Sequence, residues 1–391
     1  MSHISHLPPI KLAEDTIDKS DITALTEWLN ADIIPKLTQG ELVKKFEEEY
    51  AERINVDYCV MVNSGSSANL LMLYALDCLE EFRNKKIVVP ALSWATTVAP
   101  VIQLGYQPLF CDCNMQDLSV DLTHLEQIFK ESNPAALLLV SVLGLPPDME
   151  AIIGLCDDYG VILLLDNCES QGAKFKGIHL ENYALASTVS MYYGHNSACI
   201  EGGVISTFDE KLYDTLKMLR AHGWVRDVTD KAYYTNKWDI SDFNQLYTFF
   251  YPGFNFRSTE VQAFLALRQL EKMDAMFASR TDNFLTYQRL LKNPHWKPVV
   301  SPRGTVVNLG YPLIHPKRDE IVRVLKENNI ECRPLISGNM CGQPMIVSRY
   351  GRYAMPNAEK IQQQGMYLPN NHRITAAEIE QICGLVNGVI V

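Results

Sequence analysis

Residues 187–207 of the chain read Ser-Thr-Val-Ser-Met-Tyr-Tyr-Gly-His-Asn-Ser-Ala-Cys-Ile-Glu-Gly-Gly-Val-Ile-Ser-Thr. β-Branched residues at both ends of this stretch predict two short strands, and the polar residues and glycines between them predict an exposed loop. The loop contains one histidine, His195, and closes with Gly202 and Gly203. Loops held between regular elements often carry catalytic side chains, so this loop is the first candidate for an active site.

Unbroken apolar runs elsewhere in the chain predict an α/β fold. They lie at residues 58–62, 87–90, 108–111, 136–140 and 161–165. Helical patterns alternate with them, which favours a largely parallel sheet that is covered on both faces. We expect a large domain over residues 1–275, including an N-terminal arm, and a smaller α+β domain over residues 276–391. Further expected elements are a strand at 305–309 and helices at 43–50, 149–159, 261–277 and 318–328.

Composition excludes several classes of protein. The net charge of −11 and the isoelectric point near 5.4 argue against binding to nucleic acid or to a membrane surface, because either would require a basic face. No apolar run reaches the roughly 18 residues of a membrane span. The N-terminus lacks the pattern of a signal peptide, so a cytoplasmic location is expected. The ten cysteines then read as small core residues.

Polar residues follow three of the predicted strands. Gly65, Ser66 and Ser67 form a small-residue turn between a strand and a helix, which suits a phosphate group, although a simple helix cap is an alternative. Trp94 follows the strand at 87–90. Its flat apolar face suits stacking on a flat ring, and packing in the core is the alternative. Asp166 follows the strand at 161–165, where a carboxylate is costly unless it has a partner; the alternative is an N-cap.

The spacing of Ser190, position 195 and Gly202-Gly203 resembles the signature of the DegT/DnrJ/EryC1/StrS sugar aminotransferases. These are pyridoxal-phosphate (PLP) enzymes of fold type I that act on nucleotide-linked keto sugars. Their Schiff-base lysine is replaced here by His195. The same replacement occurs in a branch of the family that resembles this chain, the 3-dehydratases that deoxygenate a hexose at C3.

The resemblance implies an aspartate-aminotransferase-like fold with a seven-stranded sheet, and roles for the residues at matching positions. It places the PLP phosphate at Gly65, Ser66 and Ser67, the cofactor ring on Trp94, and the ring nitrogen at Asp166. Glu169 and Ser190 are also expected at the cofactor. Asn255, in a motif similar to Gly-Tyr-Asn-x-Arg, is expected to reach the phosphate of a neighbouring subunit. The resemblance therefore implies a homodimer with shared active sites.

Two further segments match sequence motifs of the dehydratase branch. His222 and Arg226 lie in His-Gly-Trp-Val-Arg-Asp, and Arg333 and Asn339 lie in Arg-Pro-x-x-Ser-Gly-Asn. These four residues are candidates for contacts to the substrate. The alternatives are surface-loop roles for the first pair and an ordinary salt bridge for Arg333.

The function that the resemblance implies is a 3-dehydratase of a nucleotide-linked 4-keto-6-deoxyhexose, with GDP-4-keto-6-deoxy-D-mannose as the expected substrate. PLP and pyridoxamine phosphate (PMP) would be the cofactor forms, and L-glutamate the amine donor. Imidazole cannot tether the cofactor covalently, but it can act as a base near neutral pH. His195 is thus the expected catalytic residue.

Iron-sulfur dehydratases similar to this chain add a Cys-x-Cys-x7-Cys group beyond the cofactor loop. No cysteine lies between Cys199 and Cys332, and the pair Cys111 and Cys113 has no third partner. We therefore expect neither a cluster nor another metal. Two alternatives to a dehydratase remain: an aminotransferase, natural or engineered, with Lys174 or Lys176 as the nearest substitute lysines, and a non-catalytic PLP-binding regulator.

Overall fold

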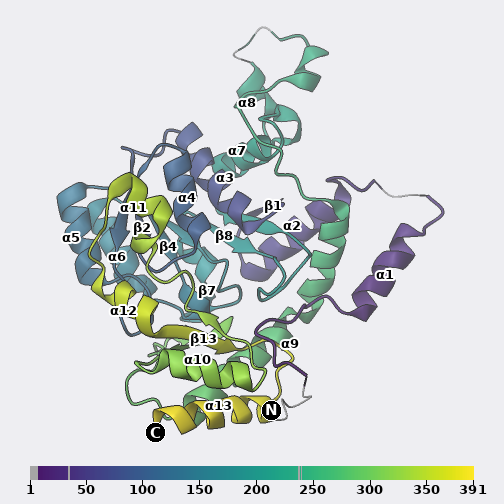
Figure 1. The fold of residues 1–391 in the computed structure, drawn as a ribbon. Helices are drawn as coiled ribbons and strands as arrows, with labels where there is room; N and C mark the ends of the chain where they lie inside the picture. The colour runs from purple at the N-terminus through teal and green to yellow at the C-terminus, as the bar shows by residue number, and fades with distance from the viewer. Residues whose placement is uncertain (1–7, 34–35, 237, 239) are drawn as a thin grey trace.

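A seven-stranded sheet forms the centre of the molecule, with the strand order β1-β9-β8-β5-β4-β2-β3. The computed structural model describes residues 8–33, 36–236, 238 and 240–391 (Figure 1). The strands are β1 (Tyr58–Val62), β2 (Lys86–Pro90), β3 (Gln107–Cys111), β4 (Ala136–Val140), β5 (Ile162–Asp166), β8 (Ala186–Ser190) and β9 (Gly203–Thr207). β9 pairs antiparallel with β1 and β8, whereas all other pairs in this sheet are parallel. The expected mostly parallel sheet is confirmed.

Helices cover both faces of this sheet because its strands are apolar on both sides. Along β4, Leu138 packs with the core on one face and Leu137 and Leu139 pack on the other, as the two-residue period of a strand requires. The first face carries α3 (Gly65–Cys78), α4 (Ala95–Gln103) and α7 (Glu210–Arg220). The second carries α2 (Glu41–Ile54), α5 (Leu122–Ser132), α6 (Met149–Tyr159) and part of α9 (Glu260–Leu290).

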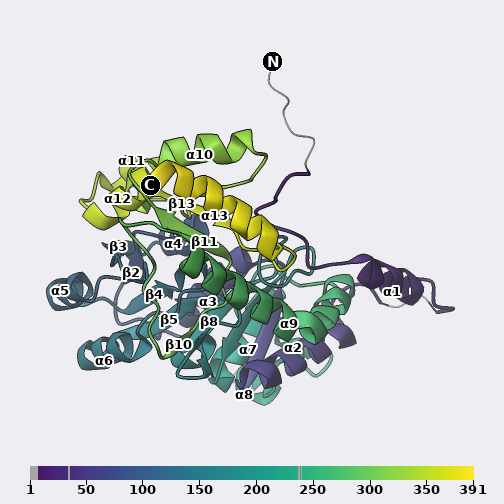
Figure 2. The same ribbon diagram turned by 90° about the horizontal axis from the view of Figure 1, so that it is seen from below.

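The C-terminal elements form a second layer along one side of the large sheet (Figure 2). They are β11 (Gly310–Ile314), α10 (Arg318–Glu327), β12 (Arg333–Pro334), α11 (Pro344–Tyr350), α12 (Pro356–Gln364), β13 (Gly365–Pro369) and α13 (Ala376–Ile390). Their strands pair in the order β11-β13-β12. Helix α9 has 31 residues and continues into this layer, so the predicted boundary at 275/276 falls inside one helix and stays a prediction.

The strand expected at 305–309 is wrong. The structure has a two-residue strand, β10 (Gly304–Thr305), and the next strand begins only at Gly310. The residues between them form hydrogen bonds with a loop instead of a neighbouring strand. The side-chain amide of Asn308 and the main-chain N–H of Leu309 both donate to the carbonyl of Leu143, at 2.6 and 3.2 Å. This segment thus ties the C-terminal layer to the loop after β4.

The remaining elements are short, apart from the N-terminal helix α1 (Lys19–Leu29), which packs on α9. They are β6 (Lys174–Phe175), β7 (Ile178–His179), α8 (Lys231–Thr235) and the 3₁₀ turns η1 (Val142–Gly144), η2 (Leu180–Tyr183), η3 (Val225–Asp227), η4 (Asn244–Tyr247) and η5 (Met340–Gly342). The segment that carries α8 projects from the body at the top of Figure 1. Among the described residues, no helix has the length and apolar character that crossing a bilayer requires. The N-terminal stretch on which the signal-peptide expectation rests lies partly outside the described residues.

Candidate active site

A cavity of about 700 Å³ lies where the parallel strands of the large sheet end. Val140, Asp166 and Ser190 line it from the carboxyl ends of β4, β5 and β8. This edge is where open α/β sheets bind ligands. The C-terminal layer supplies the opposite wall, through Leu309 and through residues of β12 and β13. The cavity therefore combines apolar side chains with polar groups from several elements, among them Asp166 on the sheet side and Arg333 on the opposite wall.

The N-terminus of α3 opens into this cavity. Ser64 caps the helix, and its hydroxyl accepts a hydrogen bond from the Ser67 N–H at 3.1 Å. Gly65 and Ser66 line the cavity, whereas Ser67 does not. A Cβ on Gly65 would stand 2.6 Å from the Cβ of Ser190, so only glycine lets the helix end approach β8 so closely. The free N–H groups of this helix end form a cradle for an anion such as a phosphate.

Trp94 precedes α4, and its side chain is 56% exposed at the cavity. That exposure excludes the core role that the sequence left open. An indole that is not packed in the core presents a flat apolar face on which a planar heteroaromatic ring can stack.

Asp166 is buried at the bottom of the cavity, with 5% of its surface exposed. One carboxylate oxygen accepts hydrogen bonds from the Asn69 amide and the Thr97 hydroxyl, both at 2.7 Å. The other oxygen accepts from the Cys168 N–H at 3.2 Å. The Thr188 hydroxyl in turn donates to Asn69 at 2.6 Å, which holds the amide in its orientation. These contacts fix the carboxylate in one position, ready for a cationic partner in the cavity.

Asn69 and Thr97 were not expected from the sequence. Each is a polar residue in the first turns of a helix, α3 and α4, that follows a strand of the parallel sheet. Such helix starts converge on the same edge of the sheet, and this is the signal that could have revealed them.

Glu169 lines the cavity three residues after Asp166. One of its carboxylate oxygens accepts from the Leu143 N–H at 2.9 Å. Burial, with a smaller contribution from the nearby Asp166, raises the pKa of Glu169 to about 8 despite the hydrogen bond from Leu143, which lowers it. A carboxyl with this pKa is mostly neutral at pH 7 and can donate a hydrogen bond to a ligand.

His195 projects from the loop between β8 and β9, where Gly194 has a φ of +93°. The ring lies edge-on to Tyr192, with centroids 6.0 Å apart. Its Nδ1 is buried and finds no hydrogen-bond partner in the described part of the chain. Burial lowers the pKa of His195 to about 4, and the charge of Arg280 contributes to this shift. The imidazole is therefore neutral at pH 7, and the residue lines the cavity.

No lysine among the described residues lines this cavity. Lys174 lies on β6, and Lys176 follows it and forms an ion pair with Glu150. Both lysines that the sequence offered as substitutes thus lie outside the site. Within residues 8–33, 36–236, 238 and 240–391, no group of three or more His, Cys, Asp or Glu is arranged to hold a metal ion.

The structure brings only one of the four predicted substrate residues to this cavity. Arg333 lines it from β12, next to Tyr367. Asn339 is buried elsewhere, where its side chain accepts from the Cys341 N–H at 2.9 Å and caps η5. His222 is exposed, with Nε2 at 3.4 Å from the guanidinium of Arg257.

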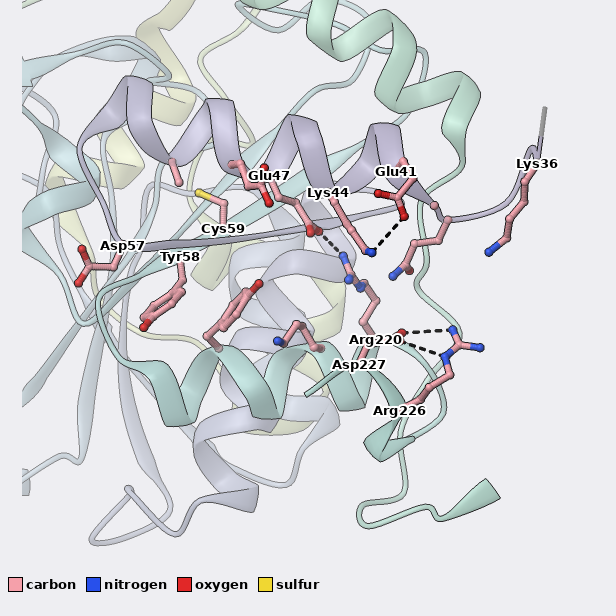
Figure 3. Close-up of a pocket in the computed structure, with 16 residues that line it drawn as sticks. Lys36, Glu41, Lys44, Glu47, Asp57, Tyr58, Cys59, Arg220, Arg226 and Asp227 are labelled. Carbon is pink, nitrogen blue, oxygen red and sulfur yellow. Dashed lines mark hydrogen bonds and ion pairs between the residues drawn. The ribbon is translucent and has the colours of Figure 1, made fainter. Parts of the chain in front are cut away.

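Arg226 lines a separate cavity of about 430 Å³ between α2, α7 and β1 (Figure 3). Its guanidinium forms an ion pair with Asp227 at 3.0 Å and lies 4.1 Å from the ring of Trp224. The same cavity contains the buried ion pair of Arg220 with Glu47. Asn255 lines neither cavity; it is exposed, and its side-chain oxygen accepts from Arg257 at 3.0 Å.

The lowered pKa of His195 should appear in the pH dependence of stability. Between about pH 4, the folded pKa, and 6.5, the ordinary value, the unfolded chain binds more protons than the folded chain. This histidine therefore makes the free energy of unfolding fall as the pH drops through that window. In His195→Asn, urea titrations at pH 7.0, 5.5 and 4.5 should show a shallower fall. If the free energy of unfolding fell equally with pH in the two proteins, the lowered pKa of His195 would be contradicted.

The fold and the site together define a PLP-dependent enzyme of the aminotransferase fold. The free N–H groups at the start of α3, the exposed ring of Trp94 and the buried carboxylate of Asp166 lie where such a cofactor would fit. Residues 15–387 match the model of the DegT/DnrJ/EryC1/StrS aminotransferase family, and the chain belongs to this family.

The chain is 33% identical to the GDP-4-keto-6-deoxy-D-mannose 3-dehydratase of Yersinia pseudotuberculosis, covering 96% of this chain and 97% of that one. Among solved structures, the Escherichia coli enzyme of the same name, with bound hydrated PLP, superposes with a TM-score of 0.88 at 31% identity. That match covers 97% of this chain and 100% of the other. An aminotransferase of pseudoaminic acid biosynthesis from Helicobacter pylori has a TM-score of 0.85 at 25% identity, covering 98% and 99%.

Proposed function

We propose that this protein is a PLP- and PMP-dependent 3-dehydratase. Its substrate is a nucleotide-linked 4-keto-6-deoxyhexose, for which GDP-4-keto-6-deoxy-D-mannose is the favoured candidate. L-Glutamate is the amine donor. One observation carries the proposal: the residue at the lysine position is a neutral histidine, in a cavity that no described lysine lines. The names of the similar dehydratases support the same substrate.

The residues of the cavity fit PLP or PMP. The N–H groups at Gly65 and Ser66 would hold the phosphate, Trp94 would stack on the ring, and Asp166 would pair with the ring nitrogen. Glu169 would donate a hydrogen bond to the phenolic oxygen. A ring that is protonated at nitrogen accepts electrons from a bond that breaks beside it, and this is the chemistry the cofactor supplies.

His195 moves the protons of the reaction. Its imidazole, which lines the cavity, would take a proton at cofactor atom C4′ and give one to the C3 hydroxyl oxygen of the sugar, which would leave as water. Because the side chain cannot tether the cofactor, it remains available as a base throughout the cycle. In balance, the sugar loses one oxygen at C3, and L-glutamate becomes 2-oxoglutarate and ammonia.

Arg333 is the proposed anchor for an anionic group, a carboxylate of glutamate or a phosphate of the nucleotide. Contacts of the substrate with His222, Arg226 and Asn339 remain predictions. The spacing of the cysteines supports the absence of an iron-sulfur cluster. The expected cytoplasmic location is part of this proposal.

The test is an assay with purified protein, PLP, L-glutamate and GDP-4-keto-6-deoxy-D-mannose. We expect a sugar product that has lost the 3-hydroxyl, with ammonia and 2-oxoglutarate released in equal amounts. Reactions without glutamate provide the control, since they should stop after one turnover at most. An amino sugar formed without ammonia would instead make the protein an aminotransferase, and PLP binding without any product would make it a regulator.

We further propose a homodimer in which Asn255 of each subunit completes the site of the other. Two observations support this arrangement: Asn255 is exposed outside its own cavity, and its segment carries exposed large apolar side chains. These side chains are Tyr233, Trp238, Phe243, Leu246, Tyr247 and Phe249. Their exposure is typical of a surface that another chain covers.

Shared sites predict complementation between two inactive variants. Mixing His195→Asn with Asn255→Ala should restore about a quarter of the wild-type activity, because half of the dimers are mixed and each of these has one intact site. The measurement is the ammonia assay after unfolding and refolding the mixture. Each variant alone, treated in the same way, is the control. An inactive mixture that contains mixed dimers by mass would contradict shared sites.

A further inference from the structure

Arg280 is a buried cation in the middle of α9, with 1% of its surface exposed. No carboxylate of the described residues forms an ion pair with it. Burial lowers the pKa of the guanidinium to about 10, so the group keeps its charge at pH 7. An isolated buried charge is costly, and it persists only where hydrogen bonds compensate.

The compensation comes from three main-chain carbonyls in three different segments. One terminal nitrogen of the guanidinium donates to the carbonyl of Asn370, after β13, and to that of Leu309, before β11, at 3.2 Å. The other donates to the carbonyl of His195 at 3.2 Å. The Asn370 amide returns a bond to the carbonyl of Arg280 at 3.0 Å. A single side chain thus joins the cavity loop, the C-terminal layer and the long helix.

We propose that Arg280 is a positioning residue for the reaction. Its guanidinium holds the main chain of His195 against the C-terminal layer and thereby sets where the imidazole lies in the cavity. The contact is needed because His195 follows Gly194, whose positive φ lies in a region that glycine adopts without strain. A displacement of about 1 Å in a reacting group can cost about 10²-fold in rate.

The charge of Arg280 also affects His195, through the pKa of its imidazole. It lowers the pKa of His195, although burial contributes more. Other charged or titratable groups also face the cavity or Arg280: Asp166, Cys168, Glu169, Tyr192, Tyr193, Glu201, Arg333, Tyr367 and His372. Removal of the Arg280 charge should therefore raise the pKa of His195 toward its ordinary value.

The chain offers a matched comparison on the same helix. Tyr287 is also fully buried, and its hydroxyl donates to the carbonyl of Pro369 at 2.8 Å, but it does not contact His195. Tyr287→Phe therefore removes a bond from α9 to the same C-terminal segment and reports a purely structural loss. Arg289→Met, at an exposed position of α9, controls for the loss of an arginine.

The test uses Arg280→Met and Arg280→Lys in the PLP-bound protein, at temperatures where all variants are folded. We expect kcat to fall about tenfold or more in both, with a smaller change in KM for the sugar. Tyr287→Phe and Arg289→Met should keep the wild-type kcat. If Arg280→Met does not fold, Arg280→Lys, which keeps the charge but has a single nitrogen, still tests the positioning. A wild-type kcat in a folded Arg280 variant overturns the proposal.

A second readout does not depend on activity. Histidine ring signals in ¹³C-labelled protein can be titrated by NMR, and that of His195 is identified by its loss in His195→Asn. The titration midpoint should rise in Arg280→Met and stay unchanged in Tyr287→Phe; an unchanged midpoint in both overturns the electrostatic part. The kinetic part rests on the proposed function, whereas the NMR part does not. A shifted midpoint in a protein without dehydratase activity would therefore reject the function and keep only the electrostatic effect of Arg280 on His195.

Discussion

Replacement of His195 by asparagine is expected to reduce ammonia release by about 10²- to 10⁴-fold, the contribution of a positioned general base. Asparagine has a similar shape but cannot take up a proton. PLP should still bind, because the phosphate cradle at α3, Trp94 and Asp166 are untouched. The measurements are the rate of 2-oxoglutarate and ammonia formation and the visible absorbance of the bound cofactor.

His179→Asn is the matched control for this substitution. Burial lowers the pKa of His179 to about 4, as it does for His195, but His179 lies on β7 and does not line the cavity. Both variants exchange a half-buried neutral imidazole for an amide, so they should lose comparable stability, and only His195→Asn should lose activity. If the two variants retained equal activity, the base would have to be another residue.

Asp166→Asn should produce the second large effect, a loss of about 10²-fold or more in turnover together with weaker PLP binding. The carboxylate is the proposed partner of the protonated ring nitrogen, and an amide cannot stabilise that proton. In addition, the NH₂ group of the amide would face a donor in either orientation, Asn69 and Thr97 on one side or the Cys168 N–H on the other. Turnover and the dissociation constant of PLP, from the cofactor absorbance, are the quantities to measure.

A second aspartate provides the comparison. Asp112 is likewise 5% exposed, and its carboxylate accepts from the N–H groups of Cys113, Asn357 and Ala358 at 2.9 Å, but it does not line the cavity. Asp112→Asn should destabilise the fold and leave the turnover of the folded protein unchanged. Full activity in Asp166→Asn would remove Asp166 from the proposed mechanism.

Much of the fold follows from local patterns in the sequence. The strands β1 and β4 and the helix α6 begin and end where the apolar runs predict, and the loop with His195 lies between two strands as expected. These elements could be predicted because hydrophobic periodicity and turn residues act over a few neighbours. The segment 305–309 could not be predicted in this way: its β-branched residues suggest a strand, but the Asn308 side chain and the Leu309 N–H donate to the carbonyl of Leu143 in the loop after β4.

The candidate site also has features that the sequence predicts and features that depend on the tertiary structure. The sequence by itself singled out the residues that we propose for the chemistry: His195 at the lysine position, Asp166 at the end of a strand, and the small-residue turn before α3. Only the tertiary structure decided what surrounds them. Asn69 and Thr97 meet Asp166 from two other helices, and Arg280 reaches the carbonyl of His195 from 85 positions along the chain. Burial and hydrogen bonds between distant segments determine the charge and position of a side chain, and these contacts exist only once the chain has folded.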